Sequence, residues 1–173
     1  MSRQTANAIM MIRPVKFGFN EETAISNVFQ QKDKTDEVDI QSAAIKEFDE
    51  FVSLLRKQNI EVVTFEDTPA PHTPDSIFPN NWISTHQDGT VILYPMMAPS
   101  RRMERRADII DSLENIYHFK VNRQLDYSHF ENEGKYLEGT GSIVFDYANK
   151  IAYANISDRT EAAILQEVCL ELD

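Results

Sequence analysis

The chain has 173 residues, of which 42% are apolar and 26% are charged, a composition typical of one globular domain with a sizeable core. Its formal net charge of −11 argues against nucleic acids and anionic membranes as partners, because both carry negative charge. The only cysteine, Cys169, excludes an internal disulfide and a multi-cysteine metal site and is typical of a reducing compartment.

The sequence also predicts where the protein resides. No charged segment followed by a short apolar run opens the chain. No apolar run approaches the roughly 18 residues that a membrane-spanning helix needs. We therefore expect a cytoplasmic protein.

The first third of the sequence predicts a strand, a helix and a second strand. The short apolar run Ala8–Arg13 predicts a buried strand, and the polar residues 20–39 predict a loop. Apolar residues then recur at helical spacing over 40–59. The β-branched residues of 60–65 predict the second strand.

The middle third predicts a hairpin, a helix and a strand. Apolar runs over 82–85 and 90–94 flank an Asp-Gly pair, which is a strong short-range hairpin signal. An arginine-rich helix is expected over 101–114, and a strand over 117–121.

The last third predicts two strands, 142–146 and 151–155, joined by a turn. A helix should begin near Asp158 as N-cap, with Glu161 completing a capping box. Three passes of strand and helix suggest a repeat architecture. Because the chain stops inside the third helix, we expect either a fold closed with few units or the first part of a longer protein.

The most informative stretch is HTPDSIFPNNWISTH, residues 72–86. Four of the seven prolines fall within eleven residues around its start, so turn geometry holds the backbone. A stiff polar loop that feeds a buried strand is a common way to build a small-molecule site. The alternative is a turn in which Asp75 and Asn80 cap their own backbone.

Two further segments concentrate functional groups. PSRRMERR, residues 99–106, has four arginines in an acidic protein, and Arg101 or Arg102 could hold a carboxylate. The alternative is a solvated basic face paired with Glu104 and Asp108. In the second segment, Glu138 precedes Gly-Thr-Gly at the mouth of a strand, where glycines let substrate approach the backbone; a turn residue is the alternative.

The remaining reactive side chains favour structural roles. His72, His86, His118 and His129 form no metal-ligand pair and are expected at the surface or in turns. Cys169 lies at helical spacing with apolar residues, which favours core packing over catalysis. We expect neither a metal nor a cofactor.

DSIFPNNW, APSRRMERR and LEGTGSIVFD followed by ISDRT together resemble the guanidine-modifying superfamily. It includes arginine deiminases, dimethylargininases, amidinotransferases and citrulline hydrolases. FPNNW and the opening MMIRPVKFGFN are most similar to the citrulline hydrolase branch, and the resemblance covers essentially the whole chain, 1–173, as the N-terminal part of one domain.

The resemblance implies an α/β propeller of ββαβ units, of which this chain would form about three. It implies a hydrolase in which a cysteine thiolate attacks the ureido or guanidino carbon of citrulline or an arginine derivative. A histidine would act as general acid and base. In the family both residues lie in the C-terminal half, so we expect this chain alone to lack the nucleophile and to be inactive.

The resemblance also implies roles for single residues. Glu138 matches the catalytic acidic residue that holds the guanidinium, and Arg159 the arginine that holds the substrate α-carboxylate. Arg101 or Arg102 matches a second carboxylate-binding arginine. The other matches to substrate-binding positions are Asp75, Phe78 and Asn81.

Asn81 departs from the deiminase pattern, which has an aspartate there. A guanidinium offers only donors, whereas a ureido group also offers a carbonyl acceptor, to which an amide can donate. We therefore hypothesise that Asn81 moves preference from arginine towards citrulline. The alternative from another class is a non-catalytic truncated propeller module that binds an amino acid or a protein. A truncated propeller would expose the faces that its missing units cover, which favours a homo-oligomer or aggregation.

Overall fold

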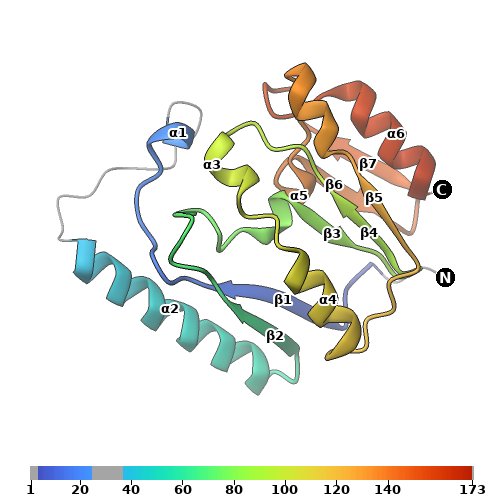
Figure 1. Ribbon diagram of the computed structural model, residues 1–173. Coiled ribbons are helices and arrows are strands. Elements are labelled where there is room, and N and C mark those ends of the chain that lie inside the picture. The colour runs from blue at the N-terminus through green and yellow to red at the C-terminus, as the bar shows by residue number, and fades with distance from the viewer. Residues whose placement is uncertain (1–3, 25–36, 173) are drawn as a thin grey trace. The chain divides into compact units, whose positions relative to one another are not determined.

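The computed structural model describes residues 4–24 and 37–172. The chain forms two compact units. The N-terminal unit is Asn7–Pro79, and the C-terminal unit is Asn80–Asp173 together with the first six residues. Both contain helices and strands (Figure 1), so the expected α/β class is confirmed.

The N-terminal unit is the predicted strand–helix–strand arrangement. Strands β1 (Ala8–Arg13) and β2 (Glu61–Glu66) are parallel and in register from Ala8 opposite Glu61 to Arg13 opposite Glu66. Parallel neighbours need a crossover connection, which contains helix α2 (Glu37–Lys57). The core side chains of this unit are Ile12, Val52, Val62 and Val63.

The prediction of a loop over 20–39 is wrong at both ends, where the structure has helices. The short helix α1 (Glu21–Ala24) begins after Asn20, whose side-chain oxygen accepts the N–H of Glu22 at 3.1 Å and so caps the first turn. Helix α2 begins at Glu37, before the first apolar residue of its predicted stripe. Residues 25–36 lie outside the described residues.

The C-terminal unit contains a three-stranded sheet with the order β3-β4-β5. Strands β3 (Ile83–Thr85) and β4 (Thr90–Leu93) form the predicted antiparallel hairpin. After helix α4 (Ala107–Asn115), strand β5 (Arg123–Asp126) returns parallel to β4. The 3₁₀ turn η1 (Pro79–Asn81) precedes this sheet.

A second, two-stranded sheet completes the C-terminal unit. Strands β6 (Ile143–Asp146) and β7 (Ile151–Ala154) are antiparallel, as predicted, and helix α6 (Ala162–Leu172) follows. Its two buried side chains join a core that also draws on β4 and β6. This core consists of Ile92, Tyr94, Tyr127, Leu137, Ile143, Ile164 and Val168.

The prediction of one continuous helix over 101–114 is wrong, because the structure interrupts it in the middle. The structure has α3 (Pro99–Arg102) and then α4, because Arg106 adopts an extended backbone with φ −121° and ψ 111°. Around this break Arg101 pairs with Glu104, Arg105 with Glu131 and Arg106 with Asp108.

The strand predicted over 117–121 is also wrong. Tyr117 is 40% exposed, and His118 has a left-handed φ of 57°. The edge strand is β5 instead, because Asn122 donates to the Asp88 carbonyl and Arg123 to the Thr90 hydroxyl at 2.8 Å. These contacts with the hairpin turn determine the register.

The last helix begins at Ala162, so the predicted start near Asp158 is wrong. Thr160 forms isolated β-bridges with Leu137 and Ser157, which keeps this segment out of the helix. The Glu161 side chain instead accepts the N–H of Ala163 at 3.3 Å and acts as the N-cap.

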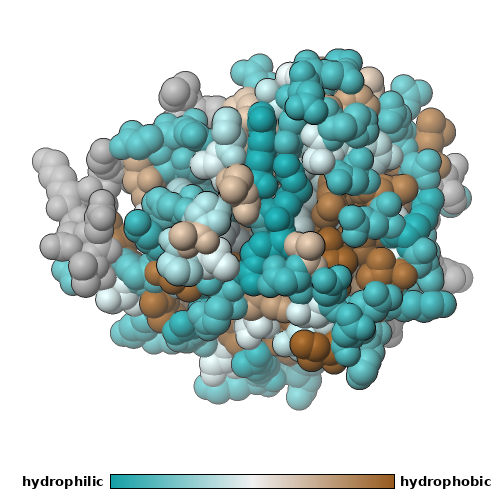
Figure 2. Space-filling view, in the orientation of Figure 1, coloured by the Kyte–Doolittle hydropathy of each residue, from teal (hydrophilic) through white to brown (hydrophobic). Residues whose placement is uncertain are grey.

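Figure 2 shows hydrophilic side chains over most of one face, with hydrophobic side chains gathered in the region of α4 and β5. A groove of about 240 Å³ there is lined by residues that include Trp82, Leu93 and Ile110. Within the described part of the chain, no helix is long and apolar enough to cross a membrane.

Candidate active site

Glu138 lies at the centre of a buried polar cluster in the C-terminal unit. It directly precedes the one-turn helix α5 (Gly139–Ser142) and is 2% exposed. Its backbone N–H donates to the Arg159 carbonyl at 3.2 Å, and the preceding Leu137 N–H donates to the Pro95 carbonyl at 3.1 Å. The backbone around the carboxylate is therefore held from both sides.

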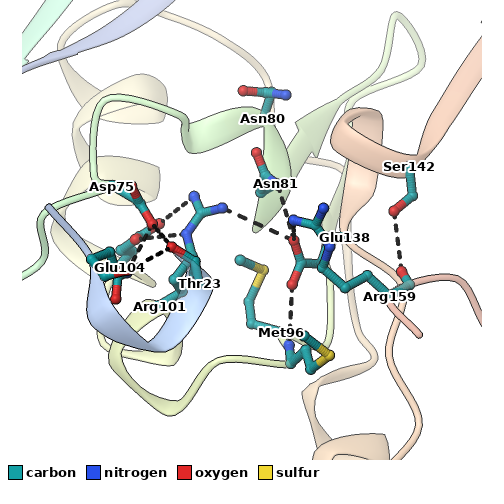
Figure 3. Close-up of polar contacts among 12 residues, drawn as sticks. Thr23, Asp75, Asn80, Asn81, Met96, Arg101, Glu104, Glu138, Ser142 and Arg159 are labelled. Carbon is teal, nitrogen blue, oxygen red and sulfur yellow. Dashed lines mark hydrogen bonds and ion pairs between the residues drawn. The ribbon is translucent and has the colours of Figure 1, made fainter. Parts of the chain in front are cut away.

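The Glu138 carboxylate accepts hydrogen bonds at both oxygens (Figure 3). Oε2 accepts from Asn81 Nδ2 at 3.1 Å, and Oε1 accepts from the Met97 backbone at 3.2 Å. Oε2 also lies 3.5 Å from Arg159 Nη1 and 4.0 Å from Arg101 Nη1. Two hydrogen-bond donors and two arginine side chains therefore surround this buried carboxylate.

The two glycines after Glu138 let α5 approach the loop before β3. Gly139 has φ +38°, and a Cβ there would lie 2.4 Å from the Asn80 carbonyl oxygen. A Cβ at Gly141 would lie 2.5 Å from Asn81 Nδ2. Glycine is therefore needed at 139 for both backbone and space, and at 141 so that the Asn81 amide can reach Glu138.

Arg101 is committed to an acidic neighbour. Its Nε and Nη2 donate to the two carboxylate oxygens of Glu104, both at 2.9 Å, and the side chains are 5% and 1% exposed. The alternative for this segment was a solvated basic face paired with Glu104 and Asp108. The structure confirms the pairing of Arg101 with Glu104, but the pair is buried and not solvated.

Arg102 binds backbone carbonyls. It donates to Met96 O at 2.9 Å and to Met97 O at 3.1 Å. Glu131, in the 3₁₀ turn η2 (Ser128–Glu133), accepts the Met96 N–H at 2.8 Å and two bonds from Arg105 at 2.5 and 2.9 Å. These groups fix the turn whose Met97 N–H donates to Glu138.

Sequence reasoning missed Glu131 and Arg105. Arg105 was part of the arginine cluster, but nothing in the spacing marked Glu131, which is 26 residues further along. A lone acidic residue acquires such a role only when the fold brings the arginines to it.

Arg159 is the most accessible of the predicted arginines. Its side chain is 33% exposed, and among the described residues the one polar contact of its guanidinium is with Glu138, through Nη1 at 3.5 Å. Its backbone is firmly held, because its carbonyl accepts from the Glu138 N–H and from the Ser142 hydroxyl at 3.1 Å.

Asp75 and Phe78 belong to the N-terminal unit. The Asp75 carboxylate accepts hydrogen bonds from Asn20 Nδ2 at 2.8 Å and from Thr23 Oγ1 at 3.1 Å, so it is tied to α1. Phe78 is 48% exposed. Within the C-terminal unit, the structure brings together Glu138, Asn81, Arg101 and Arg159.

The histidines are predicted at the surface or in turns, and the backbone of His86 does lie in the β3–β4 turn, where its carbonyl accepts from the Gly89 N–H at 3.0 Å. Its side chain, however, is buried. It is 5% exposed; its Nε2 lies 2.8 Å from the Ser84 hydroxyl and its Nδ1 3.2 Å from the Tyr147 hydroxyl. Burial lowers the pKa of His86 to about 4, which keeps the imidazole neutral at pH 7.

Cys169 does not resemble an activated nucleophile. It lies on α6 and is partly buried, and burial raises the pKa of its thiol, which disfavours the reactive thiolate. The described residues also contain no group of three or more His, Cys, Asp or Glu side chains that could hold a metal ion.

The model of the family N,N dimethylarginine dimethylhydrolase, eukaryotic, matches residues 13–173. The chain belongs to this family. The dimethylhydrolase family is part of the guanidine-modifying superfamily that the three motifs indicated, so that prediction is confirmed. A comparison with curated protein sequences gives no match.

Solved structures similar to this dimethylhydrolase family member share its fold at low identity. The N-terminal domain of ArgZ, an arginine dihydrolase of cyanobacteria, in a cysteine-to-serine variant bound to substrate, is 16% identical, with a TM-score of 0.65. DDAH from Pseudomonas aeruginosa, in a cysteine-to-serine variant with citrulline, is 18% identical, with a TM-score of 0.63.

The matches cover almost all of this chain but only part of the solved proteins. They cover 95% and 96% of this chain, and 54% and 58% of the ArgZ domain and of DDAH respectively. The chain therefore spans somewhat more than half the length of these two solved proteins.

Proposed function

We propose that the chain supplies the substrate-orienting part of a hydrolase that cleaves a C–N bond at the guanidino or ureido carbon of an arginine derivative or citrulline. The observation that carries the proposal is the buried Glu138 carboxylate, which is held by Asn81 and Met97 and faces two arginines. Membership of the dimethylhydrolase family supports the reaction class. The ligands of the similar solved structures, substrate and citrulline, support an amino-acid substrate.

In this proposal Glu138 holds the planar end of the substrate through charge-assisted hydrogen bonds. Arg159 holds the α-carboxylate, because it is accessible and weakly held. Arg101 or Arg102 supplies a second carboxylate contact, and Asn81 lines the pocket. Asp75 and Phe78, in the N-terminal unit, stay predicted substrate-binding residues.

The reaction itself would use a cysteine thiolate that attacks the substrate carbon. Ammonia or an amine leaves, and water hydrolyses the covalent intermediate. We assign this role to a cysteine other than Cys169, because that thiol is partly buried on α6 and its pKa is raised. The strand and helix order and the similar solved structures support a propeller of ββαβ units, of which this chain contributes about three.

The test measures ammonia or amine release from L-arginine, dimethylarginine and L-citrulline by the product of the complete reading frame and by the 173-residue chain. We expect the complete protein to be active on at least one substrate and the Glu138→Gln variant to lose at least 100-fold, since removing one preorganised electrostatic contact costs about 10²–10³ in rate.

The 173-residue chain should release nothing. Activity of this chain that Cys169→Ala abolishes would contradict the assignment of the nucleophile. A complete protein inactive on all three substrates would contradict the proposed reaction.

A further inference from the structure

The side chain and backbone of Arg159 are held very differently. Two hydrogen bonds to its carbonyl, from the Glu138 N–H and the Ser142 hydroxyl, fix its backbone beside the carboxylate. Its side chain is 33% exposed and makes one long contact of 3.5 Å. Arg101, by contrast, is buried, and its Nε and Nη2 donate to both carboxylate oxygens of Glu104. The backbone of Arg159 is therefore fixed, whereas its guanidinium is only weakly held.

That guanidinium is chemically the same group that Glu138 would have to bind in a guanidino substrate. We propose that Arg159 occupies the Glu138 carboxylate in the ligand-free protein and changes partner when substrate binds. The substrate guanidinium replaces Arg159 on Glu138, and the released Arg159 binds the substrate α-carboxylate. This inference rests on the proposed function and adds the class of substrate.

The balance of charge around Glu138 favours one class of substrate. In the buried cluster Arg101 offsets Glu104, and Arg159 offsets Glu138. When Arg159 leaves, Glu138 keeps its hydrogen bonds but loses its nearer cation, and an unpaired buried carboxylate is costly. A guanidino group restores the positive charge, whereas a neutral ureido group does not. The exchange therefore favours guanidino amino acids with a free α-carboxylate over citrulline.

The exchange predicts that one substitution in the 173-residue chain weakens the binding of one ligand and strengthens the binding of another. Replacing Arg159 by Gln removes both the partner of the substrate carboxylate and the competitor on Glu138. Calorimetric titration should show L-arginine binding weakened about tenfold or more, because a charge-assisted contact is lost. Agmatine, which is arginine without its carboxylate, should bind roughly threefold more tightly, because it no longer displaces a guanidinium.

Two further variants make the test specific. Arg159→Lys keeps a cation that can pair with Glu138, so it should give no gain for agmatine. Arg106→Gln removes an arginine that is paired with Asp108 and should leave both affinities unchanged. Equal weakening of arginine and agmatine by Arg159→Gln would overturn the exchange while leaving the proposed function standing.

The wild-type chain gives two more outcomes. Tighter binding of arginine than of citrulline supports the exchange, whereas tighter binding of citrulline counts against it and favours the hypothesis on Asn81. If a chain whose folding is verified by circular dichroism binds neither amino acid, the exchange is overturned. A different result, a complete protein that turns over none of the three substrates, would overturn the proposed function.

Discussion

At the scale of single residues, burial makes His86 an acid-sensitive point in the C-terminal unit. The imidazole lies between the Ser84 and Tyr147 hydroxyls and against the edge of Phe145. Burial is the largest cause of its lowered pKa, which nearby Arg123 lowers further and Asp88 raises. Protonation would place a charge in a buried site, where the cost of desolvation outweighs the stabilisation by Asp88.

The pKa of about 4 lies below that of an unfolded histidine, about 6.5. The unfolded chain therefore binds the proton first, so stability is constant above about pH 6.5 and falls as the pH drops towards 4. Between pH 7 and pH 5, His86 alone should lower the free energy of unfolding by about 2 kcal/mol. Urea unfolding at the two pH values measures this loss.

The His86→Gln variant should lose less stability over the same range, because glutamine does not titrate. His72→Gln, which changes an exposed histidine, is the matched control and should behave like the wild type. Equal losses in the wild type and in His86→Gln would show that other groups control the acid sensitivity.

At the scale of elements, the one-turn helix α5 depends on Gly139. Its φ of +38° is strained for other residues, and a Cβ would meet the Asn80 carbonyl oxygen at 2.4 Å. We expect Gly139→Ala to lower the free energy of unfolding by about 2–4 kcal/mol through strain and overpacking, as measured by chemical denaturation. Gly18→Ala, with nothing within 4 Å of the new Cβ, should change it by less than about 1 kcal/mol.

If Gly139→Ala were as stable as Gly18→Ala, the close approach of α5 to the loop before β3 would be refuted. The Gly141→Ala variant separates space from backbone strain, because Gly141 has no left-handed φ and a Cβ there meets only the Asn81 side chain.

At the scale of the whole molecule, charge opposes the association that exposed apolar side chains favour. On one face of the β6–β7 ribbon, Val144 lies opposite Tyr153, and the two are 67% and 57% exposed. We expect the 173-residue chain to self-associate through this face. Association should increase with salt, which screens the repulsion between copies with a formal charge of −11.

Light scattering after size-exclusion chromatography measures this association at low and high salt. The double variant Val144→Lys and Tyr153→Lys should remain monomeric at both. Ile116→Lys, which replaces a 64% exposed residue at the end of α4, should associate like the wild type. A monomeric wild type in high salt would contradict the prediction.

Local sequence predicted the elements whose residues interact with near neighbours. The short apolar run located β1, β-branching located β2, and the Asp-Gly pair located the β3–β4 hairpin. The glycines after Glu138 marked the site for a reason that the structure supports, since no Cβ fits at Gly139. The hairpin and the glycine positions follow from steric limits and hydrogen bonds within a few residues.

By itself, the sequence determined the α/β class and the family and predicted the residues of the candidate site, because short motifs and periodicity encode them locally. Only the tertiary structure decided that β5 is the edge strand, that Glu131 braces the Met96–Met97 turn, and that His86 is buried. It also separated the arginines, with Arg101 bound to Glu104 and Arg159 left accessible. The reason is physical: the partner of a charge and the depth of its burial depend on residues far along the chain.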